Sequence, residues 1–536
     1  MKKKTKVLFS LSALTAAAAG GAAAAEKIRT AFKKDENKRK LYDLADCAIN
    51  TVTGGLAAIL PDVGRPDLID YESENFYEGD EKFLTAPADG ARWRLGFSKE
   101  SILPYDVTND EFYIAGYLAF PPHRADGVLD DLFVRAVALD DCSGRGITVF
   151  AVVDCVGISN HDIRDIRFLL EDFAKENNIK SINVSATHCH SGLDTLGIWG
   201  DIVGSLKNNV IETIKKTYNF KSGRNARFMG ELKEKTAETI KKAVLDMKDG
   251  ELSIATVDGG KFMRDKRPPD VYLKDINVIR FIPSDGTAPT KAVFMAAHPT
   301  CVGYSNCSVS SDFPLYICSQ LEETGNNALF FQGAELAIAT ERGANIPEGL
   351  DRFEGIQEYG RVIGRFVESI GEESYKKIKP FINVGIREFY IPVTNKLFLA
   401  LGKSHLVNHN IVTVPNSSDM GFITEIGYVE LGSEYRITLL PGEAAPELLL
   451  GGCYSKEESY NHEEWTLPSM NSLTDGYMFA IGLCNDEIGY IVPDNDWGGF
   501  VAPLHYEELV STGKTAASHI VKAFMALVDE CKAKKN

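Results

Sequence analysis

A strand–helix–strand pattern between residues 147 and 188 constrains the fold more than any other feature of the chain. The run "ITVFAVVDCVGI" is almost continuously apolar, as expected for a buried strand. The next segment, "HDIRDIRFLLEDFAKENN", places apolar residues at helical spacing, and "IKSINVSATH" then returns to a strand pattern. Two strands joined through a helix are typical of a parallel crossover unit, which predicts a sheet with helices packed against it.

Periodicity along the rest of the chain predicts more elements of both kinds. Further helices are expected at about 27–60, 201–219, 230–248, 312–324, 354–371 and 504–528. Further strands are expected at about 275–283, 290–297, 327–332, 380–393, 421–430 and 434–440. Alternating elements early and adjacent strands late predict an α/β or α+β fold with a mixed β-sheet core flanked by helices.

No linker, charge block or internal repeat divides the 536 residues. We therefore expect one large domain over residues 110–536, preceded by a helical and loop-rich extension over residues 26–109. The formal net charge of −17 argues against nucleic acid as the main partner, because phosphate binding needs a clustered positive surface. The ten cysteines contain no CxxC pair, and most are expected to be buried free thiols.

The N-terminus carries a separate signal. Four lysines at positions 2, 3, 4 and 6 precede an uncharged run from Val7 to Ala25, so residues 1–25 resemble a secretory signal peptide. This predicts an extracytoplasmic or secreted protein. The alternative is a membrane anchor, since 19 residues can span a bilayer, and the basic segment that follows would then keep the body on the cytoplasmic side. Both topologies allow association with a membrane surface. The sequence does not indicate the oligomeric state.

The stretch "SATHCHSG" places His188 and His190 at the end of a predicted strand. Residues two apart on an extended chain point to the same face, and Cys189 points to the other. One imidazole could bind a metal while the other moves protons, or both could bind. A chain with ten histidines also produces such pairs by chance.

Three other polar residues follow predicted strands in the same way: His298 after "KAVFMAA", Glu443 after "YRITLLPG", and Tyr490 after "YMFAIGLCNDEIG". Histidines and a carboxylate at strand ends are suitable zinc ligands. Each residue also has a structural explanation: a hydrogen-bonded core histidine, a carboxylate at a helix N-terminus, or a packed tyrosine.

A second histidine pair, His405 and His409 in "SHLVNHN", has the i, i+4 spacing of a helical metal site. Leu406 stands where a zinc metalloprotease has its glutamate, so we expect an exposed helix face there instead. The chain has no GxSxG elbow and no P-loop, which leaves serine-hydrolase and nucleotide-binding functions without a motif.

Taken together and in order, these motifs resemble the neutral/alkaline, non-lysosomal ceramidases. The family motif "THTHSGP" compares with "ATHCHSG", and "AAHPT", "LPGEAAPE" and "GLCNDEIGY" follow in family order. Upstream, "GYLAFPPHRADGVLDDLFVRAVALDD" resembles a family segment, as does "PLHYEELVST" near the C-terminus. The resemblance covers residues from about 110 to 515 and implies a single ceramidase-like catalytic domain.

The resemblance also implies a site and a reaction. His188, His298, Glu443 and Tyr490 match the family's zinc ligands. His190 matches the second histidine of the motif, which is expected to handle protons or to contact the substrate. Tyr506 resembles a tyrosine that polarises the scissile carbonyl, and Arg264 resembles an arginine that could stabilise the oxyanion. The implied function is zinc-dependent hydrolysis of an N-acyl amide bond in a lipid-like or other small substrate, as in sphingolipid metabolism.

Several departures from the family pattern leave the substrate open. "HSGLDTLG" replaces "HSGPGG", "QGAELAIAT" stands where the family has "NxGDVSPN", and an extra stretch lies near residues 200–229. Only 46 residues follow Tyr490, too few for the immunoglobulin-like C-terminal domain of ceramidases. The alternatives are therefore a zinc hydrolase of a non-sphingolipid amide or peptide-like molecule, and a non-catalytic, membrane-associated binding protein that reuses the fold.

Overall fold

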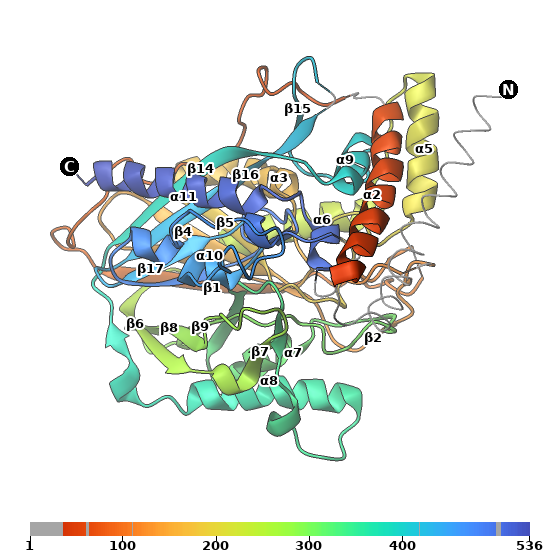
Figure 1. The fold of residues 1–536 in the computed structure, drawn as a ribbon. Coiled ribbons are helices and arrows are strands. Elements are labelled where there is room, and N and C mark those ends of the chain that lie inside the picture. Colours follow the sequence, from red (N-terminus) through yellow and green to blue (C-terminus); the bar gives the residue numbers. More distant parts are fainter. Residues whose placement is uncertain are drawn as a thin grey trace.

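The structure, a computed structural model, describes residues 36–60, 64–109, 111–119, 121–417, 419–499 and 505–535. Two β-sheets form the centre of the molecule, with helices outside them (Figure 1). The N-terminal segment predicted to be a signal or an anchor lies outside the described residues. Among those that are described, no helix is both long and apolar enough to cross a bilayer.

The larger sheet has nine strands and contains the crossover unit predicted from the sequence. Its order is β11-β9-β8-β6-β1-β3-β4-β5, with β13 paired to β6. β4–β5 and β9–β11 are parallel pairs, whereas the other pairs are antiparallel, so the sheet is mixed as predicted. The strands are β1 (Trp93–Ser101), β3 (Phe133–Asp140), β4 (Ile147–Val153), β5 (Ile179–Ala186), β6 (Lys248–Asp258), β8 (Asp275–Pro283), β9 (Thr290–Met295), β11 (Asn327–Gln332) and β13 (Lys376–Lys377).

The smaller sheet has five strands in the order β14-β16-β17-β19, with β15 paired to β16. Its strands are β14 (Ile382–Pro392), β15 (Ile411–Thr413), β16 (Met420–Leu431), β17 (Tyr435–Leu439) and β19 (Tyr477–Ile481). Apolar side chains from both sheets form one buried cluster, which includes Val137, Phe150 and Phe294 from the larger sheet and Val429 and Ile437 from the smaller. The two sheets therefore pack face to face, and burial of both faces explains their continuous apolar runs.

Helices complete the layers on either side. α3 (Asn160–Leu169), α6 (Ala226–Leu245), α7 (Phe313–Glu323) and α8 (Arg352–Glu368) accompany the larger sheet, and α11 (Ala516–Ala533) packs on β14 and β16 of the smaller sheet. α4 (Glu171–Glu176) completes the crossover from β4 to β5. α2 (Glu36–Ile59) and α5 (Ile202–Lys215) stand at one end of the molecule near α9 (Lys396–Lys403) (Figure 1). α10 (Pro446–Leu450) lies between β17 and β19 in the chain.

Short strand pairs and 3₁₀ turns join these layers. The strand pairs are β2 (Gly127–Val128) with β10 (Ser308–Val309), β7 (Met263–Asp265) with β12 (Ile338–Thr340), and β18 (Glu443–Ala444) with β20 (Tyr490–Ile491). The 3₁₀ turns are η1 (Gly260–Phe262), η2 (Gly343–Asn345), η3 (Glu372–Ser374), η4 (Met470–Leu473), η5 (Asp494–Asp496) and η6 (Glu507–Val510).

The larger sheet curls so that its two edges approach one another. β11 at one edge lies close to β4 and β5 at the other. The side chain of Gln332, at the end of β11, fastens this closure: its Nε2 donates to the carbonyl oxygens of Thr187 at 3.2 Å and Ala297 at 2.7 Å. Its Oε1 accepts from the backbone N–H of Ala297 at 3.1 Å. The segments that follow β5 and β9 are thereby brought together.

The sequence predictions of the major elements are largely confirmed, and the differences have physical causes. β8 and β11 have the predicted bounds. The described part of residues 26–109 contains α2 and loops, and it also supplies β1, which pairs with β3 and β6 inside the larger sheet. β1 reads "WRLGFSKES", and its alternating polar residues lack the continuous apolar run of a buried strand. All ten cysteines are free, and six of them are buried.

The His405–His409 pair is where the sequence prediction is wrong. α9 ends at Lys403, and His405 has a φ of 58°, so the two histidines do not share a helix face. His409 is buried in the loop that follows, stacked on Phe422 with ring centroids 4.6 Å apart. Residues four apart are neighbours only within a helix, so this spacing does not bring His405 and His409 together.

Candidate metal centre

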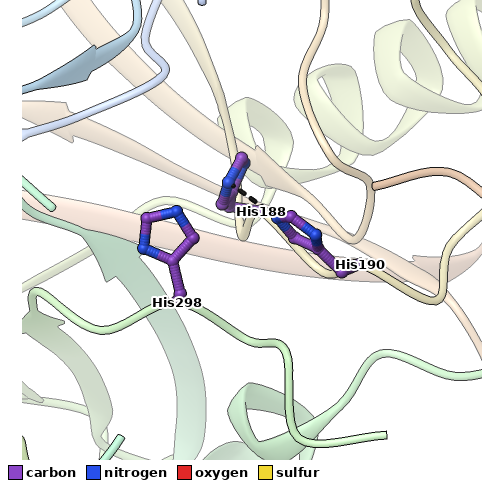
Figure 2. A group of neighbouring side chains, drawn as sticks. All are labelled: His188, His190 and His298. Carbon is purple, nitrogen blue, oxygen red and sulfur yellow. Dashed lines mark hydrogen bonds between the residues drawn. The ribbon is translucent and has the colours of Figure 1, made fainter. Parts of the chain in front are cut away.

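Three histidines from two strand ends converge in the buried interior. His188 and His190 follow β5, and His298 follows β9 (Figure 2). One ring nitrogen from each lies within 4.8 Å of the other two. The Nε2 atoms of His188 and His190 are 3.0 Å apart, and the rings of His188 and His298 have centroids 4.9 Å apart.

Backbone carbonyl groups orient two of the three rings. His188 Nδ1 donates to the carbonyl oxygen of Val156 at 2.7 Å, and His298 Nδ1 donates to that of Ile338 at 3.1 Å. A carbonyl oxygen only accepts, so each bond assigns the proton to Nδ1 and leaves Nε2 directed to the centre of the cluster. Histidines that bind metals are held in this way, with the far nitrogen donating to a carbonyl or carboxylate.

Glu443 completes the cluster from the smaller sheet. Its Oε2 lies 2.8 Å from His298 Nε2 and 3.2 Å from His188 Nε2. Burial opposes ionisation of this carboxyl, yet the two imidazoles hold its pKa well below the usual range. Burial likewise opposes the charge on His188, but Glu443, with a smaller contribution from Glu335, raises its pKa to about 10. The centre of the cluster therefore stabilises positive charge.

These separations fit a zinc ion. Ligands about 2.0–2.1 Å from a tetrahedral zinc lie roughly 3.3 Å from one another. Two distances join ligand atoms expected from the sequence: 2.8 Å between His298 Nε2 and Glu443 Oε2, and 3.2 Å between His188 Nε2 and the same oxygen. The donor set of imidazoles and one carboxylate is the set that zinc prefers in hydrolytic sites.

Tyr490 is the direct neighbour of Glu443. The two residues are register partners in the parallel β18–β20 pair, and the Tyr490 ring lies nearly parallel to that of His298 with centroids 6.2 Å apart. Burial, followed by the charge of Glu443, raises the pKa of Tyr490 well above its ordinary value. Its strand pairing places this residue directly beside Glu443.

His190 differs from the other two histidines. Burial, followed by the charges of His188 and His298, lowers its pKa well below the ordinary value, so its imidazole is neutral. Its Nδ1 is buried without a hydrogen-bond partner. Its ring meets that of Tyr117 edge-on, with centroids 5.1 Å apart. Gly116, at φ +97°, allows this packing, because a Cβ there would lie 2.5 Å from Cγ of His190.

Tyr506 lies one layer further out. Its ring meets that of Tyr490 edge-on, with centroids 6.1 Å apart. The segment around it is anchored by Arg267, whose buried guanidinium contacts Glu507 at 3.2 Å and Glu508 at 3.0 Å. The structure therefore holds Tyr506 against Tyr490 within an ion-paired segment.

Arg264 is not brought to the cluster. Its side chain is 58% exposed and pairs with Glu341 at 3.3 Å. The nearby cation is Lys266: it contributes to lowering the pKa of His298, after burial and His188. Lys266, two positions after Arg264 in "MRDKRPP", is thus the basic residue that influences the site. Sequence spacing alone does not show which of these two residues reaches it.

The sequence analysis also missed two residues in "QGAELAIAT". Gln332 links the segments carrying His188 and His298, as described above. Glu335 is fully buried 3.8 Å from His298 Nδ1, neither carboxylate oxygen has a hydrogen-bond partner, and burial raises its pKa to about 8. The sequence signal that could have identified Gln332 and Glu335 is their position at the end of an apolar strand and shortly after it.

A pocket opens beside the cluster. His188, His190, Glu443 and Tyr490 line one side of it, together with Glu487 and His409. The remaining wall is apolar and comes from Leu196, Ile198, Trp199, Phe398, Val407 and Val510. A small apolar pocket with convergent polar groups is the usual form of a small-molecule site.

Comparison with known proteins places the fold. Neither a family model nor a curated protein sequence matches the chain. Among solved structures, neutral ceramidase from Pseudomonas aeruginosa is similar with a TM-score of 0.62 and 13% identity over 82% of this chain and 75% of that one. A ceramidase complexed with C2 is similar with a TM-score of 0.62 and 13% identity over 83% and 76%. The chain therefore has a ceramidase-like fold, and the predicted mixed α/β class is confirmed.

Proposed function

We propose that the protein is a zinc-dependent amide hydrolase of ceramidase type. The observation that carries the proposal is the convergence of His188, His190, His298 and Glu443 from separate strand ends into one buried cluster beside an apolar pocket. The ceramidase-like fold supports an amide as the substrate. The overall reaction adds water across a C–N bond and yields a carboxylic acid and an amine.

His188, His298, Glu443 and Tyr490 would hold the ion. The carbonyl groups of Val156 and Ile338 keep the first two Nε2 atoms free for this role. When bound, zinc supplies Lewis-acid polarisation and makes water a nucleophile near neutral pH. The negative charge of Glu443 offsets part of the positive charge of the ion in this buried place.

The other side chains handle protons and developing charge. The neutral imidazole of His190 accepts the proton of the attacking water and returns it to the nitrogen of the leaving amine. Tyr506 lies on the outer side of Tyr490, where its hydroxyl is suited to donate to the carbonyl oxygen as that oxygen becomes negative. Apolar residues around the pocket exclude bulk water, which strengthens both interactions. Arg264 has no part in this proposal, because its guanidinium pairs with Glu341 at the surface.

The test combines metal analysis with hydrolysis. Purified full-length protein should contain about one zinc per chain and should release the acid from a fluorescent short-chain ceramide or from a simple N-acyl amine. Use of both substrates separates ceramidase activity from hydrolysis of a non-sphingolipid amide. Failure of the zinc-loaded protein to cleave either substrate would reject the enzymatic proposal and favour a binding protein.

We further propose that residues 1–25 direct the chain out of the cytoplasm. The support is the lysine-rich start followed by the uncharged run from Val7 to Ala25. Fractionation of cells producing the full-length chain with a C-terminal tag tests this. Recovery of the tag from a cytoplasmic, membrane-bound fraction would instead indicate the anchored topology.

A further inference from the structure

Part of the apolar wall of the pocket comes from one short loop, residues 194–199. Leu196, Ile198 and Trp199 from this loop line the pocket that also contains His188 and His190. The cavity they leave is about 70 Å³, whereas pockets for drug-sized molecules measure roughly 300–1,000 Å³. The loop contains most of the "LDTLG" stretch, which departs from the family pattern, and it directly precedes the extra stretch near residues 200–229.

Asp194 holds the loop in shape. Its carboxylate accepts hydrogen bonds from the backbone N–H groups of Leu196 at 2.9 Å, Gly197 at 2.8 Å and Trp199 at 3.1 Å. The side chain of Arg224 adds a bond to the carbonyl oxygen of Thr195 at 3.2 Å. Three converging N–H bonds to one buried carboxylate fix the backbone, so the three apolar side chains are presented in one arrangement.

A second layer stops the loop from moving outward. Gly197, at φ +92°, packs so closely that a Cβ there would lie 2.5 Å from the carbonyl oxygen of Leu406. Behind it, Asn209 of α5 donates to the carbonyl oxygen of Ser404 at 2.7 Å, which ties α5 to the end of α9. Leu196, Ile198 and Trp199 are each at most 8% exposed and belong to the same apolar cluster as Phe398 and Leu399 of α9.

We propose that the loop of residues 194–199 is the specificity element of the site and closes the pocket to long chains. The inference rests on the proposed function. The substrate is an amide that carries a short, unbranched apolar chain next to the scissile bond. Either the acyl or the amine side of the amide can supply that chain, since the two lie on opposite sides of the same carbon–nitrogen bond.

Hydrolysis of two series of amides distinguishes the two sources. In one series the acyl chain runs from acetyl to palmitoyl on a fixed amine, and in the other the amine chain lengthens on a fixed acetyl group. The series that enters the pocket should show kcat/KM rising with length, then falling about tenfold or more per added methylene once the chain meets the wall. The other series should show no such break.

Binding provides a readout that does not depend on turnover. Zinc-supplemented full-length protein is titrated calorimetrically with straight-chain fatty acids and with n-alkylamines below their micellar concentrations. The Kd should tighten about fourfold per methylene until the chain reaches the wall, and then stop tightening. In Trp199→Ala or Ile198→Ala the break should move to chains about two to four carbons longer.

Two further variants keep the result interpretable. Ile198→Val removes a single methyl group, so it reports on the wall if the larger truncations do not fold. Ile214→Ala truncates a side chain of α5 that is 62% exposed and should leave the break in place.

Tightening that continues to palmitate in the wild-type protein, or a break that no wall variant moves, would overturn the inference. A break in binding without hydrolysis of any amide would reject the proposed function and leave the role of the loop intact.

Discussion

One histidine from each pair, His188 and His409, lines the same pocket, yet the two differ in charge. His188 lies 3.2 Å from the Glu443 carboxylate, and its pKa is raised to about 10 against the effect of burial. His409 lies in the wall of the same pocket, yet burial lowers its pKa to about 4, and its Nε2 donates to the carbonyl oxygen of Glu487 at 2.6 Å. The charge of Glu443 outweighs burial at His188, whereas burial outweighs the neighbouring groups at His409, although Asp486 Oδ1 lies 3.7 Å from His409 Nε2.

The comparison teaches that spacing does not make a metal site. His405 and His409 have a recognised ligand spacing, but His405 stacks on Phe220 with centroids 3.8 Å apart, away from the cluster. His188 and His190 have the weaker spacing, but His298 and Glu443 meet them from elsewhere in the chain. A metal needs several converging donors, so the long-range contacts decide the outcome.

The largest expected effect is loss of the metal. Glu443→Ala removes the carboxylate that balances the charge of the ion, and His188→Ala removes a nitrogen donor; each should abolish stoichiometric zinc and lower activity by at least about 10³-fold. His405→Ala is the matched control from the other pair and should keep its zinc. Metal analysis of the purified proteins tests whether the metal depends on His188 and Glu443 but not on His405. Full zinc retention in both cluster variants would show that it does not.

His190→Ala should separate proton transfer from metal binding. Loss of the imidazole should lower kcat by about 10²–10⁴-fold, because it removes the proposed proton acceptor that lies 3.0 Å from His188 Nε2. Zinc content should stay at the wild-type level if the four ligands are His188, His298, Glu443 and Tyr490. Loss of zinc in this variant would instead make His190 a ligand and remove its proton-transfer role.

Gln332→Leu should weaken the cluster without touching a ligand. Its amide joins Thr187 and Ala297, the residues that precede His188 and His298, so its loss leaves the two histidines less well positioned. A chelator competition assay should show zinc affinity reduced by about 10–100-fold. Gln320→Leu, on α7 and remote from the cluster, is the matched control and should bind zinc like the wild type.

The smallest expected effect is a loss of stability at acidic pH that His409 causes. Its folded pKa of about 4 lies below the unfolded value of 6.5, so the unfolded chain takes up the proton first as the pH falls. The free energy of unfolding should therefore fall by about 2 kcal/mol from this residue between pH 6.5 and 5. His409→Gln should flatten that part of the profile in urea denaturation, whereas His405→Gln should not. An unchanged slope in His409→Gln would show that His409 titrates normally.

Much of the fold was predictable because the signals are local. The apolar run of β4, the helical spacing of α3 and the strand β5 are visible in consecutive residues, and β8 and β11 have the predicted bounds. The crossover unit places His188 at a strand end, and the ordered motifs bring attention to His298, Glu443 and Tyr490. β1 escaped prediction because an alternating strand in the middle of a sheet does not carry the expected apolar run.

The sequence by itself determined the elements, the strand-end positions of the polar residues and the ceramidase-like order of the motifs. Only the tertiary structure decided which of them meet. It curled the larger sheet until β11 reached β5, joined the two strand ends through Gln332, paired Glu443 with Tyr490, and directed Arg264 to solvent. It also buried His409 beside the pocket without joining it to the cluster. The physical reason is that periodicity and capping act over a few neighbouring residues, whereas a metal centre and its pocket depend on burial and charge contributed by segments hundreds of residues apart.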